Sequence, residues 1–250
     1  MDLKLNGKTA LVTGASAGIG RATALALAAE GVRLAIVGRR ADALQSLADQ
    51  LHAQGAPSPT IIVQDALASD AADRTAQAAL AGLGQIDILV NNAGGSRPFK
   101  LHTEESVWEE ALTLNFTRHR QLTERLIDGM KSNAWGRVIN ITGKSEPDGI
   151  NGAFCAKAAM HSWSKGLSRE VGRNGVTVNC IAPGRILSDQ ILRNYTPEYR
   201  AWQSEHEIPM GRYGNAEELA ALVVFLASPL AQYMTGTLIP VDGGLRRYQF

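Results

Sequence analysis

The sequence predicts an α/β fold, a single domain built on a doubly wound sheet of seven parallel strands. Strand-like and helix-like segments alternate along all 250 residues, as they do in repeated βαβ units. The strand-like segments are short and apolar on both faces, which is typical of a parallel sheet covered by helices. A glycine-rich turn joins the first strand-like segment to the first helical pattern.

Each element follows from its own pattern. The predicted strands are seven short segments: 9–13, 33–38, 60–64, 86–91, 136–142, 176–181 and 237–240. The predicted helices lie between them: 18–30, 41–54, 70–83, 104–131, 152–173 and 215–227. Asn215 followed by Glu218 predicts a helix cap with its N3 partner. Because the sequence contains no repeat and no linker composition, we expect one domain over residues 1–250.

Segment 185–214 departs from the alternation. It is long, carries tyrosine, tryptophan, proline and several arginines, and follows the carboxyl end of a predicted strand. Ligands of open α/β sheets bind outside those strand ends, so the segment is predicted to be a lid over a substrate. Two small amphipathic helices covering the sheet edge are the alternative, and both descriptions can hold together.

Composition excludes several classes of function. The 25 basic and 24 acidic residues leave a net charge of +1, which gives no electrostatic argument for nucleic acid or a membrane surface. The most apolar late stretch, 216–226, is too short and too charged to span a bilayer. Cys155 and Cys180 form no disulfide framework, and their apolar surroundings predict two small buried side chains. We therefore expect a soluble cytoplasmic protein, with no metal site.

The turn after the first strand predicts a phosphate site. In residues 9–20, an apolar run breaks into Gly14, Gly18 and Gly20, and a helical pattern then begins. Glycines allow positive φ and close approach of the backbone to a ligand, and free N–H groups at a helix start favour an anion. The glycines alone are explained equally well by a tight turn, whereas the whole pattern is Rossmann-like and indicates a nucleotide.

Several further motifs share an order and spacing with this turn: TGASAGIG (13–20), Asp65, NNAG (91–94), Asn115, Lys157, PG (183–184) and TGTLIPVDGG (235–244). On these motifs the chain resembles the short-chain dehydrogenase/reductase family over nearly its whole length, including that family's 3-oxoacyl-(acyl-carrier-protein)-reductase-like members.

The resemblance implies a binding site for a nicotinamide dinucleotide. It implies contacts to the pyrophosphate from the turn, at Gly14, Ser16, Ile19 and Gly20. It implies that Asp65 and Ala66 hold the adenine, and that Asn92, Ala93, Gly94 and Lys157 hold the ribose next to the nicotinamide. It implies that Pro183, Gly184, Ile186 and Ser188 hold the carboxamide.

The end of the second strand favours NADP(H) over NAD(H). NAD-dependent enzymes usually place an acid there for the ribose 2′-OH, but this chain has Gly38, and the next carboxylate is Asp42. Arg39 offers a planar cation that can pair with a 2′-phosphate. Against this, the basic residue often found before the middle glycine is absent, since Ala17 is there, and Arg39 and Arg40 are also explained as an exposed helix start.

The catalytic set implied by the resemblance is incomplete. The family uses a serine, a tyrosine, a lysine and a helix asparagine; Lys157 and Asn115 are present. The tyrosine should stand one helical turn before the lysine, where this chain has Ala153, and the serine position falls on Gly143.

Other side chains are available to face the substrate oxygen. Lys144 and Ser145 rank first because they are nearest the lost serine. Weaker candidates follow: Glu146, Asp148, Tyr195, Tyr199 and Arg97, the last for an anionic substrate. His161 is better explained as a hydrogen-bonded helix histidine.

The favoured function is an NADP(H)-dependent oxidoreductase that moves hydride to or from a small carbonyl or alcohol, or a related acceptor, through an atypical proton relay. The alternatives are a catalytically inactive NADP(H)-binding protein, acting as a sensor or partner subunit, and a lyase or isomerase on the same fold. The resemblance further implies a homotetramer or homodimer, built from helices 104–131 and 152–173 and the last strand.

Overall fold

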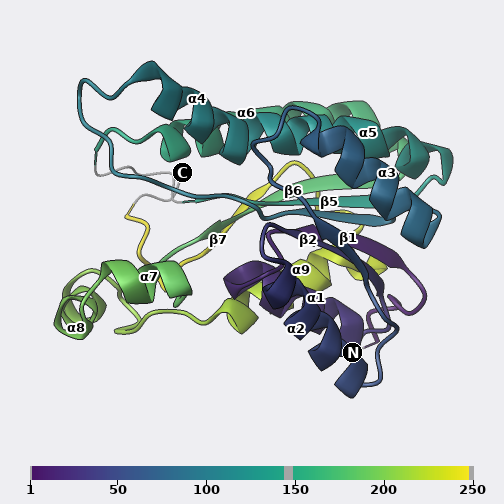
Figure 1. Ribbon diagram of the computed structural model, residues 1–250, viewed down its shortest axis with the longest axis horizontal. Coiled ribbons are helices and arrows are strands. Elements are labelled where there is room, and N and C mark those ends of the chain that lie inside the picture. Colours follow the sequence, from purple (N-terminus) through teal and green to yellow (C-terminus); the bar gives the residue numbers. More distant parts are fainter. Residues whose placement is uncertain (1, 144–148, 248–250) are drawn as a thin grey trace.

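A seven-stranded parallel sheet lies between two layers of helices in the computed structural model, which describes residues 2–143 and 149–247 (Figure 1). The strands are β1 (Thr9–Thr13), β2 (Arg33–Gly38), β3 (Thr60–Val63), β4 (Ile88–Asn91), β5 (Gly136–Ile141), β6 (Val176–Pro183) and β7 (Leu238–Val241). All seven predicted strands are confirmed, with ends that differ from the predicted ones by no more than two residues.

The strand order is β3-β2-β1-β4-β5-β6-β7, and every neighbouring pair is parallel. The chain therefore winds outward in one direction from β1 and in the other direction from β4. Between these two strands the connecting loops leave toward opposite faces, which opens a crevice at the carboxyl ends of the strands. The predicted doubly wound fold is confirmed.

Helices cover both faces of the sheet (Figure 1). One layer holds α1 (Gly18–Ala29), α2 (Ala41–Ala53) and α9 (Ala216–Ala227). The other holds α3 (Ala71–Leu83), α4 (Glu105–Leu112), α5 (Arg118–Ser132) and α6 (Gly152–Val171). Short turns of π- or 3-10 helix are η1 (Thr113–Thr117), η2 (Gly172–Asn174) and η3 (Pro229–Ala231). The continuous helix expected over 104–131 is thus wrong, because the π-turn η1 divides it into α4 and α5.

The core explains why the strands are apolar on both faces. Along β1, Ala10 and Val12 pack with the α1 and α9 side, whereas Leu11 packs with the α3 and α5 side. Successive strand residues point to opposite faces, so a sheet with helices on both sides needs an apolar residue at every position. All five residues of β1 are buried.

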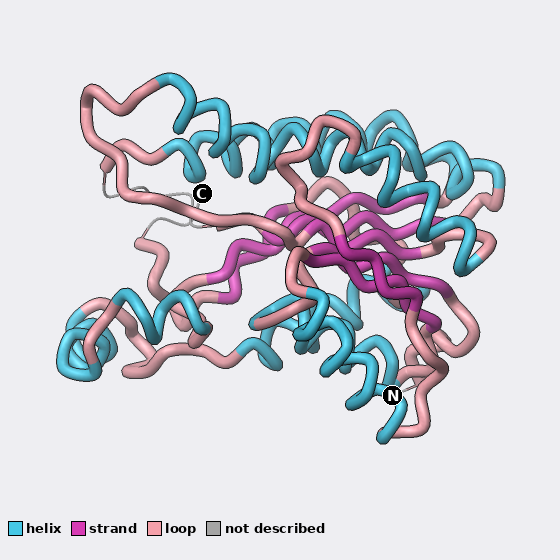
Figure 2. Tube along the Cα trace, viewed as in Figure 1, coloured by secondary structure: helices cyan, strands magenta, loops and turns pink. Residues whose placement is uncertain are grey.

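The segment after β6 forms two short helices, α7 (Asp189–Asn194) and α8 (Pro197–His206). Figure 2 shows them separated from the two helical layers by stretches of loop. Thr196 accepts a hydrogen bond from the backbone of Tyr199 and caps α8, and Pro197 occupies its first turn. The expected pair of small helices is confirmed.

Two smaller expectations have different outcomes. The capping box of α9 is confirmed, because the Glu218 carboxylate accepts from the backbone N–H of Asn215 at 2.8 Å. Cys180 is buried in β6, but the expected burial of Cys155 is wrong. Cys155 lies on the exposed side of α6, away from the buried row that includes Ala153, Ala156 and Met160.

Among the described residues, no helix is both long and apolar enough to cross a bilayer.

A buried carboxylate joins the beginnings of β1 and β4. Asp87 accepts from the backbone N–H of Thr9 at 2.9 Å and from its hydroxyl at 3.1 Å. Gln85 donates to the other carboxylate oxygen at 3.1 Å. The side chain is 3% exposed, so it has left water and depends on these donors.

We predict that Asp87→Ala lowers the free energy of unfolding by about 2–3 kcal/mol, because it leaves the buried Thr9 donors without a charged acceptor. Urea unfolding measures the change. Asp128→Ala is the matched control, because Asp128 lies on the surface of α5 and pairs there with Lys131. Equal stability of the two variants would contradict the prediction.

Candidate functional site

A cleft of about 940 Å³ lies at the carboxyl ends of the strands, where β1 pairs with β4. Its walls come from the loops after β1, β2, β3, β4 and β6. Most of the residues implied for cofactor binding line it: Gly14, Ser16, Ile19, Arg39, Asp65, Ala66, Asn92, Ala93, Gly94, Pro183, Gly184, Ile186 and Ser188. Segments far apart in sequence therefore meet at one cavity, whereas Gly20, Asn115 and Lys157 are not among its lining residues.

The turn between β1 and α1 has the geometry of an anion site. Gly14 has φ +66° and Gly18 φ +52°, conformations that favour glycine. A Cβ on Gly14 would lie 2.8 Å from Asn92 Nδ2, and one on Gly20 would lie 2.3 Å from the Gly14 carbonyl oxygen. The first turn of α1 has no acidic residue and no side-chain cap, so its N–H groups can serve a phosphate.

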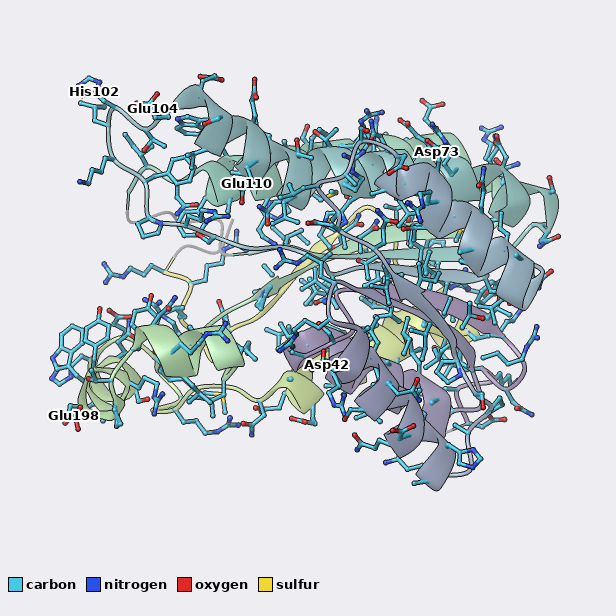
Figure 3. The ribbon with its side chains drawn as sticks, in the orientation of Figure 1. Asp42, Asp73, His102, Glu104, Glu110 and Glu198 are labelled. Carbon is cyan, nitrogen blue, oxygen red and sulfur yellow. The ribbon has the colours of Figure 1, made fainter. Side chains whose placement is uncertain are left out.

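Two arginines, Arg39 and Arg40, line the cleft just after β2. Arg40 donates to the Ser16 carbonyl oxygen at 3.3 Å, whereas Arg39 has no hydrogen-bond or ion-pair partner within the described part of the chain. A Cβ on Gly38 would lie 3.3 Å from Ser16 Cβ, so a larger side chain there would need the Ser16 side chain to shift by a few tenths of an ångström. Asp42 lies at the start of α2 (Figure 3).

The NNAG segment is held by Thr13, which sequence analysis did not single out. The backbone N–H groups of Asn92 and Ala93 both donate to the Thr13 hydroxyl, at 2.9 and 3.0 Å. The Asn92 amide donates to the Thr13 carbonyl oxygen at 2.9 Å. These bonds hold the segment against the carboxyl end of β1. The segment therefore stabilises the carboxyl end of the sheet as well as lining the cleft.

Asn115 creates the π-turn that interrupts the long helix. Its amide nitrogen donates to the carbonyl oxygens of Ala111 (2.9 Å) and Gly95 (3.0 Å), and its side-chain oxygen accepts from Gly95 N at 3.2 Å. The side chain thus intervenes in its own helix, which is one recognised origin of a π-bulge. At 2% exposure it positions the loop after β4 rather than facing the cleft.

Two residues just beyond the π-turn also bind cleft loops. Arg118 donates to the carbonyl oxygens of Ala66 (2.7 Å) and Ser69 (3.2 Å), in the loop after β3. His119 Nε2 lies 2.6 Å from the Ala93 carbonyl oxygen, which can only accept, so Nε2 carries the proton. Burial, and then the charge of Lys157, lowers the pKa of His119 to about 4, so the imidazole is neutral near pH 7.

Lys157 extends along the end of β5. Its ammonium donates to the carbonyl oxygens of Thr142 (3.0 Å) and Ile141 (3.3 Å). Burial lowers its pKa to about 8, and neighbouring Cys180 opposes that shift. A Cβ on Gly143 would lie 3.1 Å from Lys157 Cδ, so the lysine stem occupies the space beside the position implied for the serine. Ala153, one turn earlier on α6, is 2% exposed.

The proposed replacements for the missing hydroxyls are distributed as follows. Lys144, Ser145, Glu146 and Asp148 lie outside the described residues. The rings of Tyr195 and Tyr199 lie 5.4 Å apart between centroids and are tilted by 39° to each other, and neither ring lines the cleft. Arg97 does line it, but donates to Glu110 at 2.6 and 2.9 Å. His161 contacts the Thr142 hydroxyl at 2.8 Å, which confirms a hydrogen-bonded helix histidine.

Comparisons with known proteins give matches over nearly the whole chain. The family model described as enoyl-(acyl carrier protein) reductase matches residues 14–246. The 3-oxoacyl-[acyl-carrier-protein] reductase FabG of Pseudomonas aeruginosa is 36% identical over 247 residues, covering 97% of this chain and 99% of the relative. Nodulation protein G of a Rhizobium species is 37% identical over 246 residues, covering 97% and 98%.

Solved structures give the same result. L-sorbose reductase from Gluconobacter frateurii, complexed with NADPH and L-sorbose, aligns with a TM-score of 0.92 at 29% identity, covering 99% of this chain and 100% of the other. A 7α-hydroxysteroid dehydrogenase complexed with NADH and 7-oxo glycochenodeoxycholic acid aligns with a TM-score of 0.92 at 31% identity, covering 97% and 96%.

We predict that His119 makes the protein less stable in mild acid. Because the folded state keeps His119 neutral down to about pH 4, the unfolded chain binds a proton that the folded chain does not as pH falls below 6.5. Between pH 7 and pH 5 this removes about 2 kcal/mol of unfolding free energy. His119→Gln retains an N–H for the Ala93 carbonyl oxygen and does not titrate. Between pH 7 and pH 5 its unfolding free energy should therefore fall by about 2 kcal/mol less than that of wild type.

Urea unfolding at the two pH values measures the difference. His102→Gln is the control, since His102 lies at an exposed loop tip before α4 (Figure 3). The same pH dependence in wild type and His119→Gln would show that the imidazole does not stay neutral in the folded protein.

Proposed function

The chain belongs to the short-chain dehydrogenase/reductase family, and on that premise we propose that it is an NADP(H)-dependent oxidoreductase with an atypical proton relay. It transfers hydride to or from a small carbonyl or alcohol, or a related acceptor such as an activated C=C or C=N bond. The observation that carries this proposal is the single cleft at which the phosphate turn, the loop after β3 and the NNAG segment meet.

The residues of the cleft fit a nicotinamide dinucleotide. The uncapped, acid-free start of α1 suits the pyrophosphate, and the exposed Asp65 can accept from an adenine amino group. The implied partners of the nicotinamide ribose are Lys157 and the NNAG segment, whose Gly94 would place a Cβ 3.6 Å from Lys157 Nζ. Pro183, Gly184, Ile186 and Ser188 are the implied partners of the carboxamide.

Arg39 supports NADP(H) rather than NAD(H). At the end of β2 it has no partner among the described residues, and Gly38 beside it offers no carboxylate to a ribose 2′-OH. The two structural relatives were solved with different cofactors, NADPH in the sorbose reductase and NADH in the steroid dehydrogenase. The preference therefore depends on this chain's own residues.

The bound cofactor would supply or accept the hydride. The chain's residues have to hold the substrate and move one proton to or from its oxygen. Ala153 and Gly143 have no hydroxyl for this task, and Lys144 and Ser145 are the proposed replacements. Lys157, largely protonated at pH 7 with its pKa near 8, would place positive charge beside the ribose and favour a developing alkoxide.

Ala153 also favours a second candidate, an inactive NADP(H)-binding protein that acts as a sensor or partner subunit. Lys157 and Asn115 have structural contacts of their own, so their presence fits either function. In both cases we propose a homotetramer or homodimer, with α4, α5, α6 and β7 at the interfaces.

We predict that wild type binds NADPH more tightly than NADH, and that Arg39→Gln weakens NADPH binding about 10–100-fold while leaving NADH binding unchanged, because only the 2′-phosphate needs the guanidinium. Fluorescence titration with both coenzymes measures this. Arg74→Gln, which removes a surface cation of α3, is the control. Equal affinity for NADH and NADPH in wild type would contradict the preference, and no binding of either would contradict the function.

We predict that Ala153→Tyr raises the rate of NADPH-dependent ketone reduction by about 10²–10⁴-fold, the usual contribution of a general acid. Ala153→Phe supplies the same ring without the hydroxyl and should not show the gain. Turnover is followed by NADPH absorbance with a panel of ketones, imines and enones. Wild type that binds NADPH but oxidises it with none of them would favour the inactive-binder alternative.

A further inference from the structure

Within the described part of the chain, Arg118 is a buried cation without a carboxylate partner. It is 9% exposed, and its three acceptors are the carbonyl oxygens of Ala66 and Ser69 and the side-chain oxygen of Gln121, at 2.7, 3.2 and 2.6 Å. A charge removed from water is costly unless its donors are well used. Here all three acceptors are neutral, and two belong to one loop.

That loop, residues 64–70, follows β3 and carries Asp65 and Ala66, the residues implied for adenine. Asp65, Leu67 and Ser69 are exposed. The hydrogen bonds within the loop are local: the backbone N–H of Leu67 donates to the Asp65 carboxylate at 3.0 Å, and the Ala68 N–H donates to the Asp65 carbonyl oxygen at 3.2 Å. Arg118 adds a long-range connection, from a residue about fifty positions away, to two points of the loop.

Arg118 lies in a short stretch of chain that also binds a second cleft loop. It follows the π-turn made by Asn115, which binds Gly95, and precedes His119, which binds Ala93. One short stretch, 115–119, therefore holds loops after both β3 and β4. In the sheet β2 and β1 separate those two strands, so strand pairing does not align their loops.

We propose that Arg118 is the positioning residue for the adenosine half of the cofactor: it fixes loop 64–70 in the conformation that receives adenine and aligns it with the nicotinamide end of the cleft. This inference rests on the proposed function. Because the loop is ordered before the ligand arrives, binding does not have to supply the free energy of ordering it.

The test separates the two halves of the ligand. Arg118→Gln should weaken binding of NADPH and of 2′,5′-ADP, which contains the adenosine half, by at least tenfold. Reduced nicotinamide mononucleotide, which lacks adenosine, should bind as it does to wild type. Arg118→Lys keeps the charge but loses the fork of donors, so it should restore part of the affinity.

Arg125→Gln is the matched control. Arg125 lies two turns further along α5 and pairs with Asp73 on the outer side of α3 at 2.5 Å (Figure 3). This substitution removes an arginine that joins α5 to α3 without touching loop 64–70. We expect this variant to bind all three ligands as wild type does.

A second measurement needs no ligand. Hydrogen exchange of the backbone amides of residues 66–69 should be faster in Arg118→Gln than in wild type or Arg125→Gln. An equal loss of affinity for the mononucleotide, unchanged affinity for 2′,5′-ADP, or unchanged exchange in the loop would each overturn the inference. Failure of wild type to bind any of the three ligands would instead overturn the proposed function, and the exchange measurement would still decide whether Arg118 holds the loop.

Discussion

The pairing of β1 with β4 is the constraint on which the rest of the structure depends. At this pair of strands the winding of the sheet reverses direction. Hydrogen bonds of Thr9 and Thr13, the first and last residues of β1, hold the pair together. At the start, the Asp87 carboxylate binds both donors of Thr9. At the end, the Thr13 hydroxyl receives the backbone N–H groups of Asn92 and Ala93. The glycine turn then approaches these residues so closely that Gly14 has no room for a Cβ.

The second organising element is the irregular helix that crosses behind the cleft. A regular helix over 104–131 would satisfy its backbone internally and offer its side chains only at fixed intervals. The π-turn at Asn115 breaks that regularity and brings Asn115, Arg118 and His119 into contact with carbonyl oxygens of two cleft loops. The loops after β3 and β4 are thus joined through this helix, in addition to the bonds that hold the NNAG segment to Thr13.

Much of this could be predicted from the sequence because the signals were local. An apolar strand, a glycine turn and a helix start occupy twelve consecutive residues, and all seven strands follow from runs of apolar residues. The contacts of Arg118 and His119 could not be predicted, since their partners are 52 and 26 residues away and are backbone carbonyls, which leave no mark in residue type. Cys155 was misjudged because its neighbours are apolar while its own side of α6 is not buried. Lys144 and Ser145 stay predictions.

The lysine stem lying against Gly143 has a consequence for how such a site can change over evolutionary time. With only 3.1 Å between Lys157 Cδ and a Cβ at 143, any side chain acquired there meets the lysine in its present course. The effect of a substitution at 143 therefore depends on the rotamer at 157. Positions 143 and 157 are coupled, so a side chain gained at 143 would have to be accompanied by a shift of the Lys157 stem.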